Sequence, residues 1–155
     1  MAKAKTKTKP KAKAAKNGAK ADYEKLVALQ RQLKLLGGAS ALLGWDQETY
    51  MPSKGTELRA DQLALIAGIW HERFVDGEVG PLLERCERAQ DALDDRARAN
   101  LRETRRAFDR ETKLSKELVE EIAKTTSLAQ EAWQKARKAN DFSDFAPLLE
   151  MVLAL

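Results

Sequence analysis

The amino-acid sequence predicts an all-α fold, and three observations support this prediction. From Asp22 onward, apolar residues recur every three or four positions, the spacing that places them on one face of a helix. Runs of alternating apolar and polar residues, which would indicate strands, are nearly absent. Glycine, proline and capping residues divide the periodic stretch into segments of helical length. We therefore expect antiparallel helices.

Residues 1–20 differ in composition from the rest of the chain. They contain eight lysines and no acidic residue. The whole chain has 28 Lys and Arg against 24 Asp and Glu, so residues 21–155 carry a net charge of −4. Because residues 2–20 hold no large apolar residue, this segment cannot bury enough surface to offset its ordering entropy. We expect a disordered tail over residues 1–21 and a helical region over residues 22–155.

The tail matches no targeting signal. No apolar run follows the lysines, as in a signal peptide, and the Arg-rich amphipathic pattern of a transit peptide is missing. No stretch approaches the roughly 20 apolar residues of a membrane span. The single cysteine, Cys86, excludes an internal disulfide and fits a reducing compartment. We expect a cytoplasmic chain without a membrane partner.

The first expected helix begins after Asp22, a plausible N-cap. Its apolar face is formed by Tyr23, Leu26, Leu29, Leu33 and Leu36. Gly37-Gly38 should weaken or kink the helix. The apolar pattern then resumes and ends at Met51-Pro52, because proline cannot continue a helix.

A second helix is expected from about Thr56 to Phe74. Its predicted inward residues are Leu58, Leu63, Ile66, Ile69 and Trp70. Asp76-Gly77 marks a turn into a short helix. The apolar residues of that short helix are Val79, Leu82, Leu83 and Cys86.

Three more helices are expected after Asp91. The first has a thin apolar stripe, which suits the outside of a bundle: Leu93, Ala97, Leu101, Thr104 and Phe108. Ser115 is a good N-cap for the second, whose stripe is close to a heptad: Leu118, Ile122, Thr125, Ala129, Trp133 and Ala136. Ser143 should cap the third, which is apolar to Leu155 and carries no C-terminal capping residue. Such an end predicts a truncated chain.

His71-Glu72 is the one hint of a zinc-peptidase motif. That motif places two histidines one helical turn apart, as His-Glu-x-x-His, so that both bind the metal. Here Val75 stands at the second position, and His71 is the only histidine. A catalytic zinc site needs three protein ligands as a rule. The sequence therefore predicts no metal ligand in this chain and a partly exposed His71 near a helix end.

The remaining reactive side chains do not form a catalytic pattern. Most paired carboxylates, such as Asp94-Asp95, have an Arg or Lys within one turn and are typical of solvated helix pairs. Asp46 is the exception, since it could accept backbone or arginine hydrogen bonds that hold a helix end, a role that we favour over catalysis. Cys86 lies on an apolar stripe and is expected to be an inert core thiol. We expect no catalytic residue.

Residues 42–52 are more specific, because they combine the uncommon Trp and Met with an Asp-Gln pair and a closing proline: Leu-Leu-Gly-Trp-Asp-Gln-Glu-Thr-Tyr-Met-Pro. They resemble the N-terminal part of the Taq-type zinc metallocarboxypeptidases, which remove C-terminal residues from peptides. The resemblance runs from about Tyr23 to the last residue. Its other anchors are residues 59–63, 71–73, 108–114, 133–142 and 145–150.

The resemblance implies the N-terminal helical portion of such an enzyme, inactive alone. In this family a His-Glu-x-x-His helix and a downstream Glu hold zinc, and the Glu of the motif acts on the metal-bound water. No residue here matches those positions, so zinc is expected in the full-length parent and no cofactor in this chain. The signature residues carried over are structural or groove-wall positions: Trp45, Asp46, Gln47, Met51 and Pro52.

Several partners stay open. The resemblance implies the missing catalytic half, in cis or as a separate chain, and a peptide substrate for the parent. The alternative function is a free-standing helical interaction module whose lysine tail binds nucleic acid or another polyanion weakly and in a salt-sensitive way. A homodimer is a further alternative.

Overall fold

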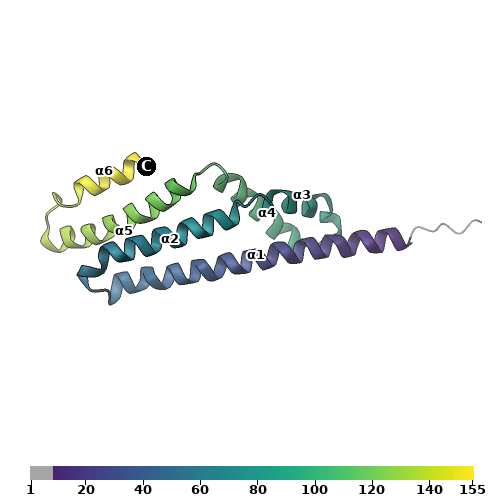
Figure 1. The fold of residues 1–155 in the computed structure, drawn as a ribbon, viewed down its shortest axis with the longest axis horizontal. Helices are drawn as coiled ribbons and strands as arrows, with labels where there is room; N and C mark the ends of the chain where they lie inside the picture. Colours follow the sequence, from purple (N-terminus) through teal and green to yellow (C-terminus); the bar gives the residue numbers. More distant parts are fainter. Residues whose placement is uncertain (1–8) are drawn as a thin grey trace, which may run out of the picture.

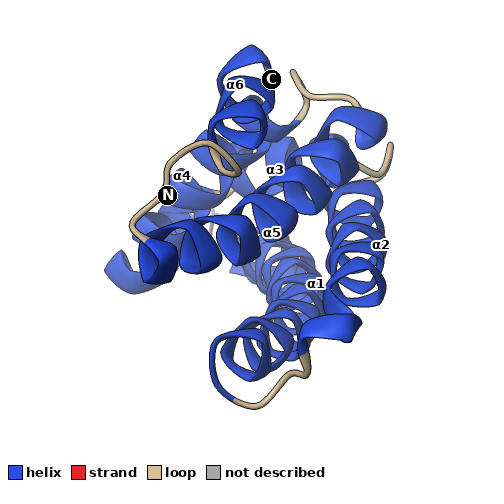
Figure 2. Cartoon of the chain, turned by 90° about the vertical axis from the view of Figure 1, so that its left-hand side faces the viewer, coloured by secondary structure: helices blue, strands red, loops and turns tan. Residues whose placement is uncertain are grey.

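The computed structural model describes residues 9–155, with side chains from residue 17 onward, and this part of the chain is helical without a strand (Figures 1 and 2). The all-α prediction is confirmed. The α-helices are α1 (Lys9–Thr49), α2 (Thr56–Phe74), α3 (Val79–Arg88), α4 (Asp95–Glu111), α5 (Lys116–Ala139) and α6 (Ala146–Ala154). Two short 3₁₀ helices, η1 (Ser53–Gly55) and η2 (Gln90–Ala92), complete the described elements.

The three longest helices lie side by side along the long axis of the molecule (Figure 1). α2 runs antiparallel to α1 and packs on both α1 and α5. α3 packs on α1 near one end of the bundle and contacts α4, while α6 packs on α5. The α1–α2 turn therefore lies at the end of the bundle opposite to α3 and α4.

The start of α1 differs from the predicted boundary at residue 22. The structure extends this helix back to Lys9, and Ala19 is only 5% exposed. Alanine and lysine are strong helix formers, which gives residues 9–21 local support for a helix, and the burial of Ala19 shows that packing reaches this stretch. The tail predicted for residues 1–8 lies outside the described residues. α1 also continues as one helix through Gly37-Gly38.

The apolar core lies between α1, α3 and α4. Its buried residues are Leu26, Val79, Leu82, Leu83, Cys86, Leu93, Ala97 and Leu101. This set confirms the stripes predicted for α3 and α4. Cys86 is fully buried, and burial raises the pKa of its thiol, as expected for an inert core cysteine. An edge-to-face pair of Phe74 and Phe108, with centroids 5.9 Å apart, links the core to α2.

Three predictions of inward residues were wrong. Leu58 is 64% exposed, Trp133 is 41% exposed and Ile122 is 37% exposed. α2 and α5 pack on each other, and the buried residues of these two helices include the small or polar Ala60, Gly68 and Thr125. The Glu120 side chain of α5 lies against Gly68 and occupies the space that a larger residue would need there. At Gly68, the close approach of α5 therefore excludes a larger side chain.

Of the predicted N-caps, Ser115 is confirmed, whereas Asp22, which lies inside α1, and Ser143 are wrong. The Ser115 hydroxyl accepts a hydrogen bond from the Leu118 N–H at 3.2 Å. Ser143 instead donates its backbone N–H to Asp141 Oδ1 at 2.9 Å, and α6 begins later, at Ala146. The proline in the first turn of α6 suits that start, because proline lacks the N–H that a first-turn residue leaves unpaired.

No helix among residues 9–155 combines the length and the apolar character needed to cross a membrane.

Candidate functional site

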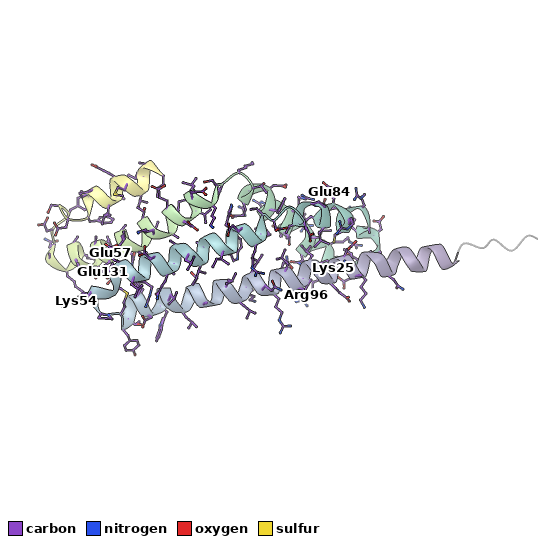
Figure 3. All side chains as sticks on the ribbon, in the orientation of Figure 1. Lys25, Lys54, Glu57, Glu84, Arg96 and Glu131 are labelled. Carbon is purple, nitrogen blue, oxygen red and sulfur yellow. The ribbon has the colours of Figure 1, made fainter. Side chains whose placement is uncertain are left out.

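The signature segment forms the end of α1 and the turn into α2. Trp45, Asp46 and Gln47 lie within the last turns of α1, and the chain leaves the helix at Tyr50. The N–H groups of Tyr50 and Met51 both donate to the Asp46 carbonyl oxygen, at 3.0 and 2.9 Å. Lys54 and Glu57, on the turn and at the start of α2, lie at the same end of the molecule as Glu131 of α5 (Figure 3).

Asp46 holds this turn through an ion pair with Arg59 of α2. The Arg59 Nη2 atom donates to Asp46 Oδ2 at 2.6 Å, and the Arg59 side chain is 11% exposed. The same guanidinium donates to the Leu43 carbonyl oxygen and, through Nε, to Gln62 Oε1 at 3.1 Å. Asp46 thus accepts the arginine hydrogen bond that the sequence led us to expect. We call Asp46 and Arg59 the α1–α2 latch.

Gln47 ties the same end of α1 to α5. Its Nε2 atom donates to the Ser127 carbonyl oxygen at 2.9 Å, and the Ser127 hydroxyl donates back to Gln47 Oε1 at 3.0 Å. Both residues are buried, and every buried side-chain polar atom among the described residues has a partner. Successive residues of a helix point about 100° apart, which lets Asp46 and Gln47 reach two different helices.

The other signature residues lie further out. Trp45 is 57% exposed and meets exposed Tyr50 in an edge-to-face pair with centroids 5.5 Å apart. Met51 is half-buried and packs against Gly55, where an added Cβ would come within 3.3 Å of the Met51 Cγ atom. Pro52 is exposed and precedes η1. The segment therefore has an inner half that joins three helices and an outer aromatic pair open to solvent.

His71 lies in the last turn of α2, near a helix end as the sequence suggested, but it is buried. It is 2% exposed rather than partly exposed, with Nδ1 3.4 Å from Glu111 Oε2. The end of α2 packs against α4 and α5, and this packing covers the histidine. Across the described residues, no group of three or more His, Cys, Asp or Glu side chains is placed to hold a metal ion.

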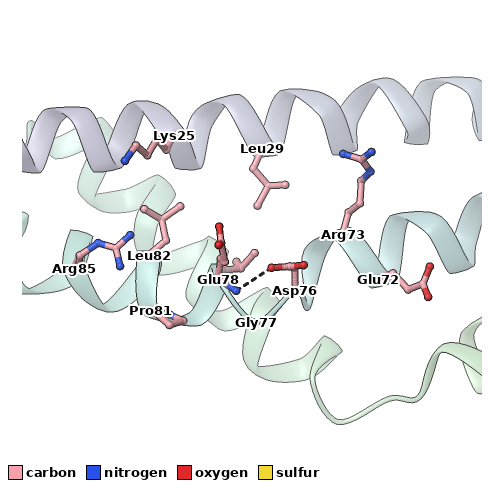
Figure 4. A pocket seen from close by; sticks show the side chains of 11 residues that line it. Lys25, Leu29, Glu72, Arg73, Asp76, Gly77, Glu78, Pro81, Leu82 and Arg85 are labelled. Carbon is pink, nitrogen blue, oxygen red and sulfur yellow. Dashed lines mark hydrogen bonds between the residues drawn. The ribbon is translucent and has the colours of Figure 1, made fainter.

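A large pocket lies away from the signature segment, between α1 and the α2–α3 turn. It has a volume of about 1140 Å³ and an apolar side that includes Leu29 and Leu82 (Figure 4). Lys25, Arg73 and Arg85 contribute positive charge, and the turn contributes carboxylates. Figure 4 also shows the Glu78 N–H donating to Asp76 Oδ1, at 2.9 Å. No local sequence pattern predicts this pocket, because its wall combines residues some 50 positions apart along the chain.

Comparisons with known proteins place this geometry in context. Residues 25–155 match the family model described as carboxypeptidase Taq (M32) metallopeptidase. Thermostable carboxypeptidase 1 of Thermus thermophilus is 39% identical over 138 residues, which cover 87% of this chain and 27% of that protein. Thermostable carboxypeptidase 1 of Pyrococcus furiosus is 30% identical over 132 residues, covering 85% of this chain and 26% of that protein.

Solved structures show the same relationship. Metallocarboxypeptidase 1 of Trypanosoma cruzi superposes with a TM-score of 0.65 and 33% identity, over 86% of this chain and 27% of that one. A Pyrococcus furiosus carboxypeptidase superposes with a TM-score of 0.60 and 28% identity, again over 86% and 27%. The chain thus spans about 27% of the length of the first relatives that it matches.

Proposed function

The chain belongs to the carboxypeptidase Taq (M32) metallopeptidase family, and on that premise we propose that it forms the N-terminal helical portion of a zinc-dependent metallocarboxypeptidase. The activity of the whole enzyme would be the hydrolytic removal of C-terminal residues from peptides. The family match over residues 25–155 carries this proposal. Because the chain spans about 27% of its relatives, the activity is proposed for the assembled enzyme and not for these helices alone.

The described residues do not fit a catalytic zinc. They offer no cluster of three ligand-type side chains, and the only histidine, His71, is enclosed beside Glu111. A catalytic zinc needs three protein ligands as a rule. We therefore assign no step of the hydrolysis to these residues and place the metal in the part of the family fold that this chain does not span.

The role proposed for the signature residues is to build a wall of the substrate groove. The α1–α2 latch and the Gln47–Ser127 hydrogen bonds hold the end of α1 against two other helices. That support would fix Trp45 in position, and its exposed ring could pack on an apolar side chain of a peptide. Met51 and Pro52 would shape the turn.

The proposal is tested with the chain alone and with a chimera. In the chimera, residues 25–155 replace the matching N-terminal part of the Thermus thermophilus carboxypeptidase. With zinc or cobalt and a blocked dipeptide, we expect no turnover above buffer from the chain alone and release of the C-terminal residue by the chimera. Turnover by the chain alone, or an inactive chimera beside an active Thermus thermophilus enzyme, would contradict the proposal.

The comparisons give no support to the alternative of a free-standing interaction module. The separate catalytic chain, the homodimer, the weak polyanion contact and the cytoplasmic location stay predictions. Salt-dependent retention on DNA that disappears when residues 1–20 are deleted would support the polyanion contact.

A further inference from the structure

α6 is apolar on every side. Between Ala146 and Ala154 its one charged residue is Glu150. A helix that is apolar all round is normally buried in a larger protein. Here α6 is the one α-helix of the described residues that has no buried residue, and Met151 and Leu153 are 53% and 78% exposed. The surface of α6 that faces away from α5 is therefore suited to a contact that the described residues do not supply.

A groove beside α6 is also poor in charged residues. It lies between α5 and α6, has a volume of about 440 Å³, and is lined by Thr126, Ala129, Gln130, Trp133, Phe145, Leu149 and Val152. No lining residue is charged, although 34% of the chain is charged. α6 lies at the outside of the bundle next to α5 (Figure 1). Depletion of charge is typical of the desolvated centre of a protein interface.

A second exposed apolar surface, on α1 and α2, fits such an interface less well. Its leucines are Leu35, Leu42, Leu58 and Leu65. Exposed charged residues share their helix faces, since Arg31 is one turn from Leu35 and Asp61 is one turn from both Leu58 and Leu65. An interface there would have to desolvate those charges, whereas the groove has no charged residue and α6 carries only Glu150.

We infer that α6 and the α5–α6 groove form the surface on which the catalytic portion of the metallocarboxypeptidase packs. This inference rests on the proposed function. The relatives are much longer than the match, which covers 27% of the Thermus thermophilus protein, so most of their fold must meet this helical unit somewhere. Of the exposed apolar surfaces described above, the uncharged groove together with the exposed residues of α6 is the one that a permanent interface could cover with the lowest cost of desolvating charged groups.

The test is Leu153→Lys, measured in the chain alone and in the chimera. In the chain alone, Leu153 is 78% exposed and a lysine in the last turn of a helix suits the helix dipole. The unfolding equilibrium constant should change there by less than about threefold. In the chimera the same substitution places a charge in the interface, and the constant should rise at least about tenfold. Ala28→Lys, at an exposed position of α1, is the control and should change neither.

The possible failures are distinguishable. An active chimera that tolerates Leu153→Lys as well as Ala28→Lys would overturn the docking surface and leave the proposed function standing. A chimera that folds without activity, beside an active Thermus thermophilus enzyme, would overturn the proposed function and with it this inference. Destabilisation of the chain alone by Leu153→Lys would show that α6 already buries this residue, and would also overturn the inference.

Discussion

Arg59→Ala should remove the main attachment between the end of α1 and the start of α2. Arg59 donates to three acceptors, which are Asp46 Oδ2, the Leu43 carbonyl oxygen and Gln62 Oε1. A hydrogen bond to a charged group contributes about 1.5–3 kcal/mol and a neutral one about 1 kcal/mol. Because Asp46 is 39% exposed and regains water when the arginine is lost, the sum must be discounted. We expect a loss of about 3 kcal/mol in the free energy of unfolding.

A double-mutant cycle separates the ion pair from the other bonds. Asp46→Ala alone should cost about 1.5 kcal/mol, because it removes one of the three acceptors. The coupling energy between Asp46→Ala and Arg59→Ala should be about 1–2 kcal/mol. Arg59→Lys keeps the positive charge but loses the planar guanidinium that donates to several acceptors at once, so its stability should lie between those of Arg59→Ala and the unchanged protein.

Urea unfolding followed by far-UV circular dichroism gives these free energies. A coupling energy below about 0.3 kcal/mol would refute the latch, because the two side chains would then act independently. Strong loss of the coupling in molar salt would also contradict it, since a pair whose arginine is 11% exposed should be screened only in part.

Three further predictions concern the core. Leu83→Ala should lower the free energy of unfolding in urea by about 2–5 kcal/mol, because Leu83 is fully buried. Leu58→Ala should change it by less than about 0.5 kcal/mol, because Leu58 is exposed. Similar losses for both variants would contradict the assigned faces. Gln47→Leu should cost about 2 kcal/mol, and adding Ser127→Ala should restore part of it, because it removes the buried hydroxyl that Gln47→Leu leaves without its acceptor. Burial raises the pKa of Cys86, so the folded state holds the thiol proton more tightly. The contribution of the thiol to stability should be constant below its unfolded-state pKa and should fall as the pH rises above that value. This alkaline loss should be smaller in Cys86→Ala, and an identical pH profile for the two proteins would exclude a contribution from the thiol.

Local sequence signals predicted the helix boundaries well where a particular residue type, such as proline or a capping serine, sets the boundary. Pro52 ends α1 and leads into η1, and α2 runs from Thr56 to Phe74, as expected. Ser115 caps α5 as predicted because an N-cap needs only a side-chain oxygen three residues before its partner. The start of α1 was harder to predict, since a lysine- and alanine-rich stretch favours helix locally and lacks the apolar residues on which the periodicity test depends.

The sequence by itself determined the helical class, most helix ends and the family, through the signature of residues 42–52. The apolar stripes of α3 and α4 were also readable from the sequence, whereas on α1, α2 and α5 only the tertiary structure decided which side chains are inside. Gln47 is buried because Ser127, 80 residues away, supplies both of its partners, while Leu58 and Trp133 stay exposed although their apolar spacing favours an inward position. Burial depends on what lies across the interface, and apolar spacing within one helix carries no information about that neighbour.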